Sequence, residues 1–446
     1  MTNPQQLPQT HRGSRPHLLP VAALLLTLLA SGPLACGPRH LVEEPVPAAP
    51  EELRRWSELS KSGRSDLLFH RYEEAEKKFE AALELSREYR PSDVRRRSSL
   101  GNLERLATAY WKAGRRRDFD RVMELLLEAA PEVPTYQTET LTNGLLLLGV
   151  RKRSQGDLEA SREALELALS ISTQMAGERD IGVARIHMEL GLTCLDSGDL
   201  DRAERELTEA LNIIEESAGR ENPAYASALI AMAKLHEAQQ RGDVAETEFR
   251  RAVELNRATG GASHNATMNA MVDLARFYQR QNRMDDAEAT FKEMVAVQRE
   301  ADETTLSYVQ GLNALAWFYV DTGRPGEAEA PARAALETLD SMNVGGASRA
   351  TVLDTLATSL RDRGLYPEAE KLYLQAIEES RGGMRPGEAD EIVGRYAELL
   401  RQQGRGAEAD QLLEKLRDPS LDSGRAGSHV GVTPEVGEAE QQSGRD

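Results

Sequence analysis

The residue types that most often carry catalysis or bind metals are present in this sequence, but they do not stand at productive spacings. His236-Glu237 is the closest approach to a zinc-protease motif, and Gln240 occupies the position of its second histidine. The sequence has no phosphate-binding glycine loop, no Cys-x-x-Cys pair and no Gly-x-Ser-x-Gly elbow, and its eight histidines are dispersed. We therefore predict no catalytic residue, no metal site and no cofactor, and we expect the protein not to be an enzyme.

Cys36 is the residue whose position most clearly indicates a covalent modification. Two arginines precede an apolar run over residues 18–30, which is too short to span a bilayer comfortably, and small residues follow it. This order is typical of a secretory signal peptide. The pair Ala35-Cys36 resembles a bacterial lipobox, in which the peptide is cut before the cysteine and the sulfur carries a lipid. Pro33 departs from that pattern, because leucine usually stands there.

The lipobox resemblance implies an exported protein of the cell envelope. It predicts a signal peptide over residues 1–35 and a lipid anchor at Cys36, which would make the protein an outer-membrane lipoprotein facing the periplasm or the surface. Gly37 fits the outer membrane, whereas Asp at that position would suggest retention in the inner membrane. Ordinary secretion with cleavage near Ala35 is the alternative. The other cysteine, Cys194, is expected on the packed side of a helix, where a thiol behaves as a small apolar group.

Composition divides the chain and excludes one class of partner. Residues 36–52 are rich in proline and predict an extended linker, residues 53–417 carry a repeat array, and residues 418–446 have too few apolar groups to order and predict a disordered tail. The formal net charge of −18 argues against a nucleic-acid partner, because phosphate binding needs a basic face. The arginine runs at 95–97 and 115–117 are interpreted as solvated helix ends and turns.

The elements that would position any site repeat about every 42 residues. Residues 308–349 illustrate one unit: Leu312, Leu315 and Tyr319 share one face of a helix, Gly323 ends it, and Pro325 begins a second helix. Each unit is therefore a helical hairpin. Because such a unit cannot bury its apolar face alone, the period predicts an all-α solenoid of about nine antiparallel helical hairpins.

The spacing within each unit resembles the tetratricopeptide repeat, and the longer period resembles the kinesin light chain type of that family. This resemblance implies that the solenoid is a right-handed superhelix. The small residue of the first helix recurs along the chain as Ala107, Gly149, Gly191, Ala233, Ala275, Ala316, Ala357 and Ala397. Two units depart from the pattern. The first unit has Gly63 and Asp66 where packed residues are expected, and the second has Phe119 where a small residue belongs.

The resemblance implies a groove along the first helices that binds a peptide or protein partner. Positions next to the packed ones are predicted to line it, and the selected residues are Thr108, Trp111, Lys234, Arg276, Gln279, Asn313, Trp317, Asp354, Thr358 and Arg361. Such a set can hydrogen-bond an extended backbone or a carboxylate, with tryptophan as an apolar anchor. A solvated face without a fixed ligand is the alternative for any single residue.

Together these features predict a protein- or peptide-binding scaffold or adaptor in the bacterial cell envelope. A regulatory adaptor that uses its acidic outer face or tail is one alternative. Another is an assembly factor of the envelope, for a secretion or surface polymer system. We expect a protein or peptide partner, no nucleic acid, and membrane attachment through the N-terminal lipid anchor.

Overall fold

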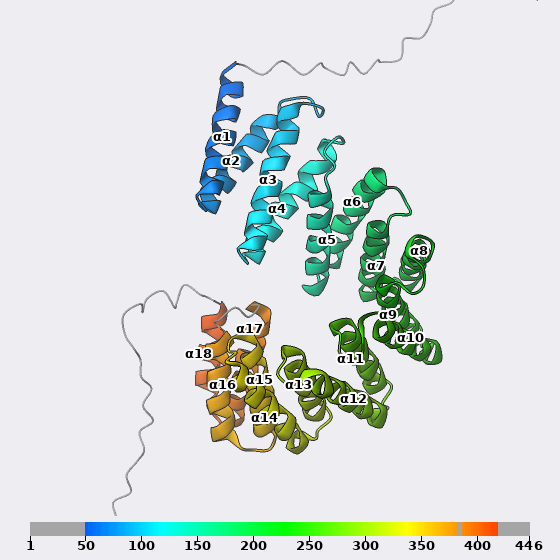
Figure 1. Ribbon diagram of the computed structural model, residues 1–446. Helices are drawn as coiled ribbons and strands as arrows, with labels where there is room; N and C mark the ends of the chain where they lie inside the picture. The colour runs from blue at the N-terminus through cyan, green and yellow to red at the C-terminus, as the bar shows by residue number, and fades with distance from the viewer. Residues whose placement is uncertain (1–49, 381–385, 418–446) are drawn as a thin grey trace, which may run out of the picture. The chain divides into compact units, whose positions relative to one another are not determined.

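The computed structural model describes residues 50–380 and 386–417, and this part of the chain consists of helices and their connections. The predicted signal peptide, nearly all of the predicted linker and the predicted tail lie outside these residues. The α-helices, which are labelled in Figure 1, are α1 (Pro50–Leu68), α2 (Tyr72–Arg87), α3 (Val94–Lys112), α4 (Arg116–Ala129), α5 (Glu139–Ser154), α6 (Leu158–Ala176), α7 (Ile181–Asp196), α8 (Leu200–Ala218), α9 (Pro223–Ala238), α10 (Gly242–Gly260), α11 (Asn265–Arg280), α12 (Met284–Asp302), α13 (Leu306–Asp321), α14 (Pro325–Met342), α15 (Ala347–Asp362), α16 (Tyr366–Ser380), α17 (Pro386–Gln402) and α18 (Gly406–Arg417). A short 3-10 turn, η1 (Ala130–Glu132), follows α4.

The helices pair as nine antiparallel hairpins, from α1/α2 to α17/α18, which confirms the predicted all-α repeat solenoid. The period is visible in the helix lengths. The first helices α5, α7, α9, α11, α13 and α15 each have 16 residues, and the second helices α6, α8, α10 and α12 each have 19. The repeat in sequence is therefore a repeat of one structural unit.

The turn inside each hairpin depends on one residue with a left-handed backbone. This conformation strains most side chains and is easiest for glycine, with asparagine the next best. The turns accordingly use residues with φ between 58° and 82°, which are His70, Gly114, Gly156, Gly198, Gln240, Asn282, Gly323, Gly364 and Gly404. The glycines that the sequence places at the ends of first helices are thus turn residues.

Small residues let the two helices of a hairpin approach closely. A Cβ atom added to Gly149 would lie 2.6 Å from Cγ of Leu165, and one added to Gly191 would lie 2.5 Å from Cγ of Leu207. At the same place in later units Ala316 is fully buried. Close packing at these positions explains why the pattern tolerates only glycine and alanine.

The first hairpin is more regular than its sequence predicts. Gly63 occupies the small-residue position, because a Cβ there would lie 2.6 Å from the ring of Phe79. Asp66 is 4% exposed and forms ion pairs with Arg71 and Lys78. A buried carboxylate is tolerated here because two cations neutralise it. Gly63 and Asp66 therefore both pack within the hairpin, and the expectation that they make the first unit depart from the repeat is wrong.

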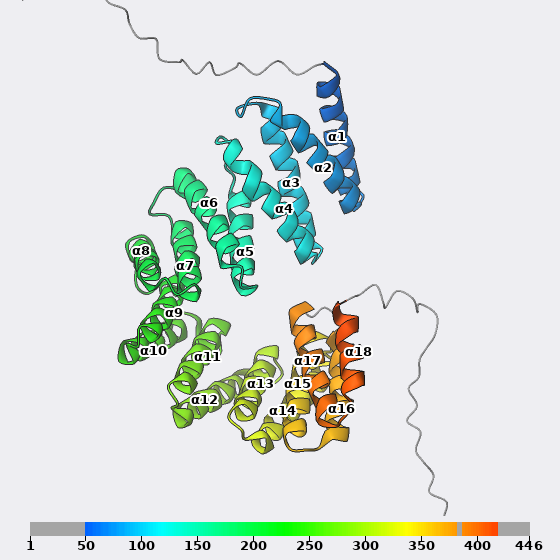
Figure 2. The ribbon, with the colours of Figure 1, turned by 180° about the vertical axis from the view of Figure 1, so that it is seen from behind.

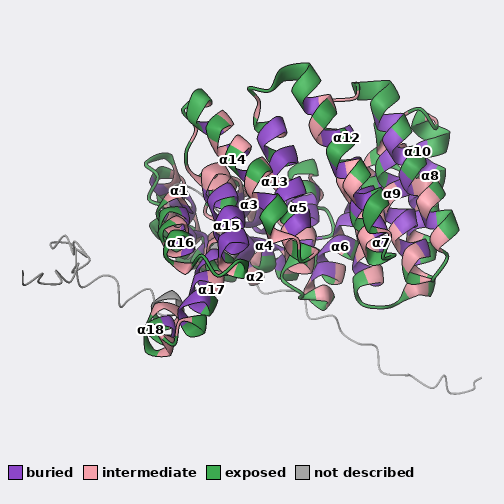
Figure 3. Ribbon diagram, turned by 90° about the horizontal axis from the view of Figure 1, so that it is seen from below, coloured by how far each residue is buried: buried purple, intermediate pink, exposed green. Residues whose placement is uncertain are grey.

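Successive hairpins stack so that most of their first helices also touch one another, whereas α9 and α11 make at most a slight contact. The contact is most extensive between α13 and α15, and the described second helices make no comparable contact among themselves. The first helices therefore line one side of the array, which we call the first-helix face (Figures 1 and 2). Buried residues follow the sides of helices that meet their neighbours (Figure 3), and Cys194 is among them, as predicted.

An arginine at the start of the second helix joins several hairpins to the preceding one. In the clearest case the Tyr319 hydroxyl donates to Glu288 over 3.1 Å, and Arg324 binds the same carboxylate at 2.5 Å while lying 4.8 Å from the tyrosine ring centroid. Glu246, Tyr278 and Arg283 repeat this arrangement one unit earlier. We call each set of three a junction triad.

Candidate functional site

A cavity of about 790 Å³ opens on the first-helix face between α11, α13, α15 and α17. Its wall combines three kinds of group: arginines and carboxylates, amides and hydroxyls, and the aromatic side chain of Trp317. Two smaller hollows continue it. One of about 270 Å³ lies between α11 and α13, and one of about 200 Å³ lies between α13 and α15. We call the three together the groove.

Trp317 forms the aromatic part of the wall. It lies on α13, is 37% exposed, and is the largest exposed aromatic side chain in the described residues. The guanidinium of Arg395, from α17, lies 5.3 Å from its ring centroid. This stacking holds the indole in place while part of its surface stays open to the groove.

Arg395 is itself fixed by a buried carboxylate. It donates two parallel hydrogen bonds to Asp354, from Nε over 3.0 Å and from Nη2 over 2.8 Å. Asp354 is only 3% exposed, and burial raises its pKa although Arg395 opposes that effect. Glu391 adds a second, more exposed contact to Arg395 at 3.5 Å. The charges at this end of the groove are therefore already satisfied within the protein.

Asn313 and Arg276 are the groups of the wall without such partners. The Oδ1 atom of Asn313 is buried and accepts no hydrogen bond from any residue that the structure describes. Arg276 is exposed on α11 and forms no ion pair within the described part of the chain. A buried acceptor without a donor is costly unless water or a ligand supplies one. These two groups are therefore free to bind a ligand in the groove.

Neutral polar side chains cover the hollows on both sides of α13. Asn265 and Asn269 lie on α11, Gln310 lies on α13 and Thr351 lies on α15. Gln310 borders all three hollows. Amide groups both donate and accept hydrogen bonds, so this wall can match a peptide backbone without requiring a particular charge.

Half of the sequence-predicted groove residues meet in the main cavity. Those on its wall are Arg276, Gln279, Asn313, Trp317 and Asp354. Gln279 donates to Asp321 over 3.3 Å across the gap between α11 and α13. The structure thus brings together five predicted residues from three successive first helices.

The other five predicted residues do not line this cavity. Thr358 does not face a groove at all: it is 3% exposed and its hydroxyl lies 2.9 Å from that of Tyr373 in the core. The prediction fails there because neighbouring hairpins cover α15, so that nearly every residue from Ala350 to Leu360 is buried.

The four remaining residues have partners of their own. Trp111 is covered by Arg116, whose guanidinium lies 3.6 Å from its ring centroid, and the Thr108 hydroxyl donates to the Glu104 carbonyl over 2.9 Å. Farther along the chain, Lys234 and Arg361 form ion pairs, at 3.1 Å with Asp273 and at 3.0 Å with Glu398, respectively.

Sequence reasoning missed Gln310, Thr351 and Arg395, although all three lie on the wall. Gln310 and Thr351 stand at equivalent places, nearer the start of their helices than the positions selected. Extending the pattern by one or two turns toward the helix start would have found them. Arg395 would not have been found, because only the packing of α17 against α15 brings it to Trp317.

The described residues hold neither a metal-binding cluster nor a helix that could span a membrane. No group of three or more His, Cys, Asp or Glu side chains there is placed to hold a metal ion. In the same residues no helix combines the length and the apolar character needed to cross a bilayer. Cys36 and the apolar run over residues 18–30 lie outside the described part.

Comparison with solved structures gives several similar chains. Crystal structures include BtubC from P. vanneervenii (19% identity, 57% of this chain and 93% of that one, TM-score 0.38) and a tetratricopeptide repeat protein from Parabacteroides merdae (16%, 67% and 98%, 0.39). A Rap protein complexed with competence and sporulation factor is 13% identical over 84% of this chain and 100% of that one, with a TM-score of 0.41. Comparison with curated proteins gives no match.

Family profiles match the repeats directly. Two profiles, both described as tetratricopeptide repeat, cover residues 141–216, 224–300 and 267–341 and residues 349–381, which together make about half of the chain. The matched residues include α11, α13 and most of α15, but not α17, which forms the remaining wall of the groove. With nine stacked helical hairpins in its described residues, the chain belongs to the tetratricopeptide repeat family.

Proposed function

We propose that this protein binds an extended segment of a protein partner in the groove formed by α11, α13, α15 and α17. Tetratricopeptide repeat proteins are generally protein-binding scaffolds, and that fold is typically not catalytic. The observation that carries the proposal is that three groups in this groove are still available to a ligand. It combines a buried acceptor without a donor at Asn313, a half-open indole at Trp317 and an unpaired cation at Arg276.

Each open group fits one part of an extended chain. A backbone N–H would supply the donor that Asn313 lacks, and Gln310 would satisfy the next backbone groups along the wall. Trp317 would take an apolar side chain, since partly buried aromatics contribute most strongly to interfaces. Arg276 would pair with a carboxylate of the segment. An extended segment could contact all of these groups at once, because the three hollows adjoin one another past α11, α13 and α15.

The same proposal places this binding in the cell envelope. The basic start, the short apolar run and Ala35-Cys36 support export and a lipid anchor at Cys36. The scaffold would then hold its partner near the outer membrane. Substitution of Cys36→Ser should abolish labelling of the protein by fatty acid in cells, and labelling that persists would contradict the anchor.

Photo-crosslinking in cells tests the groove. A photoreactive amino acid at Gln310 in the full-length protein should give a discrete adduct with a partner. The matched control carries the same amino acid at Lys371, which is exposed on the second helix α16. Combining the Gln310 probe with Trp317→Ala should remove most of the adduct. Equal adducts at both positions, or none at Gln310, would count against groove binding.

A further inference from the structure

The turn of the first hairpin exposes two large apolar side chains. Leu68 is 79% exposed and Phe69 is 70% exposed, just before the left-handed residue His70. In the other eight hairpins these two positions hold only charged, amide, hydroxyl or alanine side chains, from Lys112-Ala113 in the second to Gln402-Gln403 in the ninth. Adjacent exposed residues of this size indicate an interaction site more often than isolated ones do.

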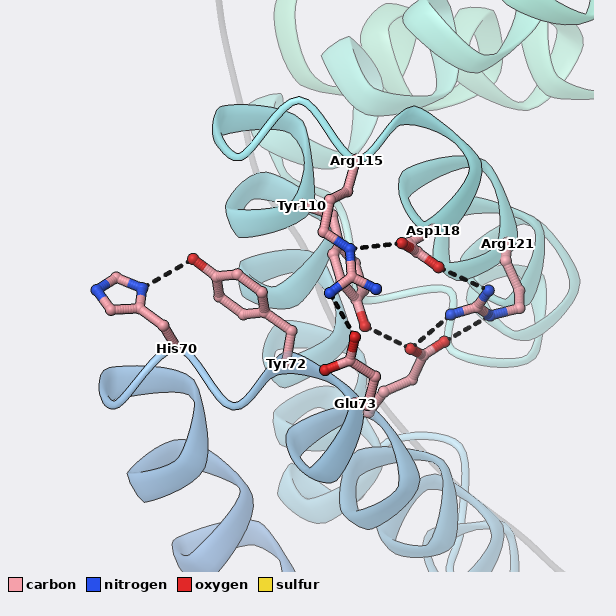
Figure 4. A network of polar contacts seen from close by, with 8 residues as sticks. His70, Tyr72, Glu73, Tyr110, Arg115, Asp118 and Arg121 are labelled. Carbon is pink, nitrogen blue, oxygen red and sulfur yellow. Dashed lines mark hydrogen bonds and ion pairs between the residues drawn. The ribbon is translucent and has the colours of Figure 1, made fainter. Parts of the chain in front are cut away.

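The apolar turn is held in this position by the polar network shown in Figure 4. His70 lies 2.8 Å from the hydroxyl of Tyr72, and the ring of Tyr72 packs at 5.5 Å against that of Tyr110 in the next hairpin. Arg115 then binds Glu73 at 2.5 Å. The turn is therefore tied to α3 and α4 through several contacts. Its two apolar side chains remain exposed although the backbone around them is well fixed.

Positive charge lies beside the apolar turn. Lys112 and Arg117 flank the adjacent turn between α3 and α4, and both are exposed without an ion pair to another described residue. Arg116 of the same turn is instead held against Trp111. Nearby acidic groups are mostly used, because Glu73 and Asp118 both pair with Arg115. This is an exception in a protein whose formal net charge is −18.

We propose that the Leu68-Phe69 turn docks on an anionic lipid surface. Leu68 and Phe69 enter the boundary between headgroups and acyl chains, while the exposed side chains of Lys112 and Arg117 face the lipid phosphates. Apolar residues flanked by basic ones are the combination that favours interfacial binding. A bilayer, unlike a shaped protein partner, needs no pocket around the two side chains, and none of the cavities described above borders them.

The proposal uses the lipid anchor of the proposed function, and the chain lengths are compatible with both. Helix α1 is about 28 Å long, from its 19 residues. The 13 residues at positions 37–49 reach at most about 45 Å when extended. A chain attached at Cys36 is therefore long enough to run back along α1 and let the turn meet the same bilayer. Anchor and turn together would give the two weak membrane signals that stable attachment requires.

Fluorescence quenching by brominated lipids tests the turn locally in the full-length chain. A small fluorescent amino acid replaces Phe69 in one variant and Leu374, which is 52% exposed on α16, in the control. With vesicles that contain phosphatidylglycerol and acyl-brominated lipid, fluorescence at position 69 should be quenched and that at position 374 should not. Quenching at position 69 should be lost in a Leu68→Ser variant and reduced by Lys112→Gln with Arg117→Gln.

Other outcomes overturn the proposal. Absence of quenching at position 69, or equal quenching at both positions, shows that the turn does not enter the bilayer. A fluorescence shift at position 69 that depends on protein concentration without vesicles assigns the turn to a second copy of the chain instead. The anchor fails separately, because it is read from fatty-acid labelling of Cys36→Ser, while the quenching reports only the depth of the turn.

Discussion

Two sides of helix α13 differ in how completely their polar groups are satisfied. On one side Tyr319 belongs to a junction triad in which hydroxyl, carboxylate and guanidinium are all bonded within the protein. On the other side, Asn313 and Trp317 face the groove with an acceptor unused and an indole half open. The first side holds hairpins together, and the second has capacity left for a ligand. Polar groups that lack a partner within the protein therefore indicate a binding site within a repeat better than residue type does.

Asp354 gives the most severe test of this distinction, because it lines the groove but is fully paired. Asp354→Ala should leave Arg395 without its buried partner and destabilise the C-terminal hairpins by about 3 kcal/mol. Urea unfolding followed by tryptophan fluorescence measures the loss. The control Glu391→Ala, at a side chain 68% exposed, should cost less than about 0.5 kcal/mol. A stable Asp354→Ala protein that had lost only partner binding would show that Asp354 serves the ligand and not the fold.

Trp317→Ala should have the largest effect on binding. Removal of an aromatic anchor at an interface costs about 2 kcal/mol, or roughly 30-fold in affinity. Titration of the partner identified by crosslinking measures it. Urea unfolding should change little, because the side chain is already 37% exposed. Tyr319→Phe on the opposite side of α13 is the matched control and should leave the affinity unchanged.

The junction triad predicts a response to acid that the groove does not share. Hydrogen bonds from Arg324 and Lys292 lower the pKa of Glu288 from its ordinary 4.5 to about 2. Because the folded pKa lies below the unfolded one, this contribution is present above pH 4.5 and is lost as the pH falls toward 2. Arg324 is 36% exposed and the pair is screened, so we expect about 1 kcal/mol.

Comparison of wild type with Glu288→Gln measures the acid response. The difference between their free energies of unfolding should be about 1 kcal/mol at neutral pH and should vanish near pH 2. A difference that stays constant over this range would show that the triad does not stabilise the fold through the charge of Glu288.

Arg276→Ala should have the smallest effect on stability. The side chain is exposed and without an ion pair among the described residues, so unfolding should change by less than about 0.5 kcal/mol. Partner affinity should nevertheless fall, and should fall less in high salt, if a carboxylate occupies the site. Arg324→Ala should do the reverse, since its charge is used within a triad. Identical behaviour of the two variants would remove the distinction between the two sides of α13.

The sequence by itself determined the repeat, because its period and its small residues follow from local geometry. Most of the turns need glycine or asparagine, and Gly191 must be small because it packs against Leu207. Both requirements arise within a single hairpin, which consists of consecutive residues. Asn313 and Trp317, which line the groove, were also predicted from the sequence, because they stand next to packed positions of the repeat.

Only the tertiary structure decided which groove positions remain open. Thr358 and Trp317 stand at related places in neighbouring units, but contacts between hairpins bury the first and leave the second accessible. Arg395 reaches Trp317 and Asp354 from another hairpin, and Lys234 is occupied by Asp273. The two ion pairs join residues about forty positions apart, and the contact between Arg395 and Trp317 joins residues 78 positions apart, through side chains whose directions no local pattern fixes. The repeat is therefore a property of the sequence, whereas the site depends on how the repeats stack.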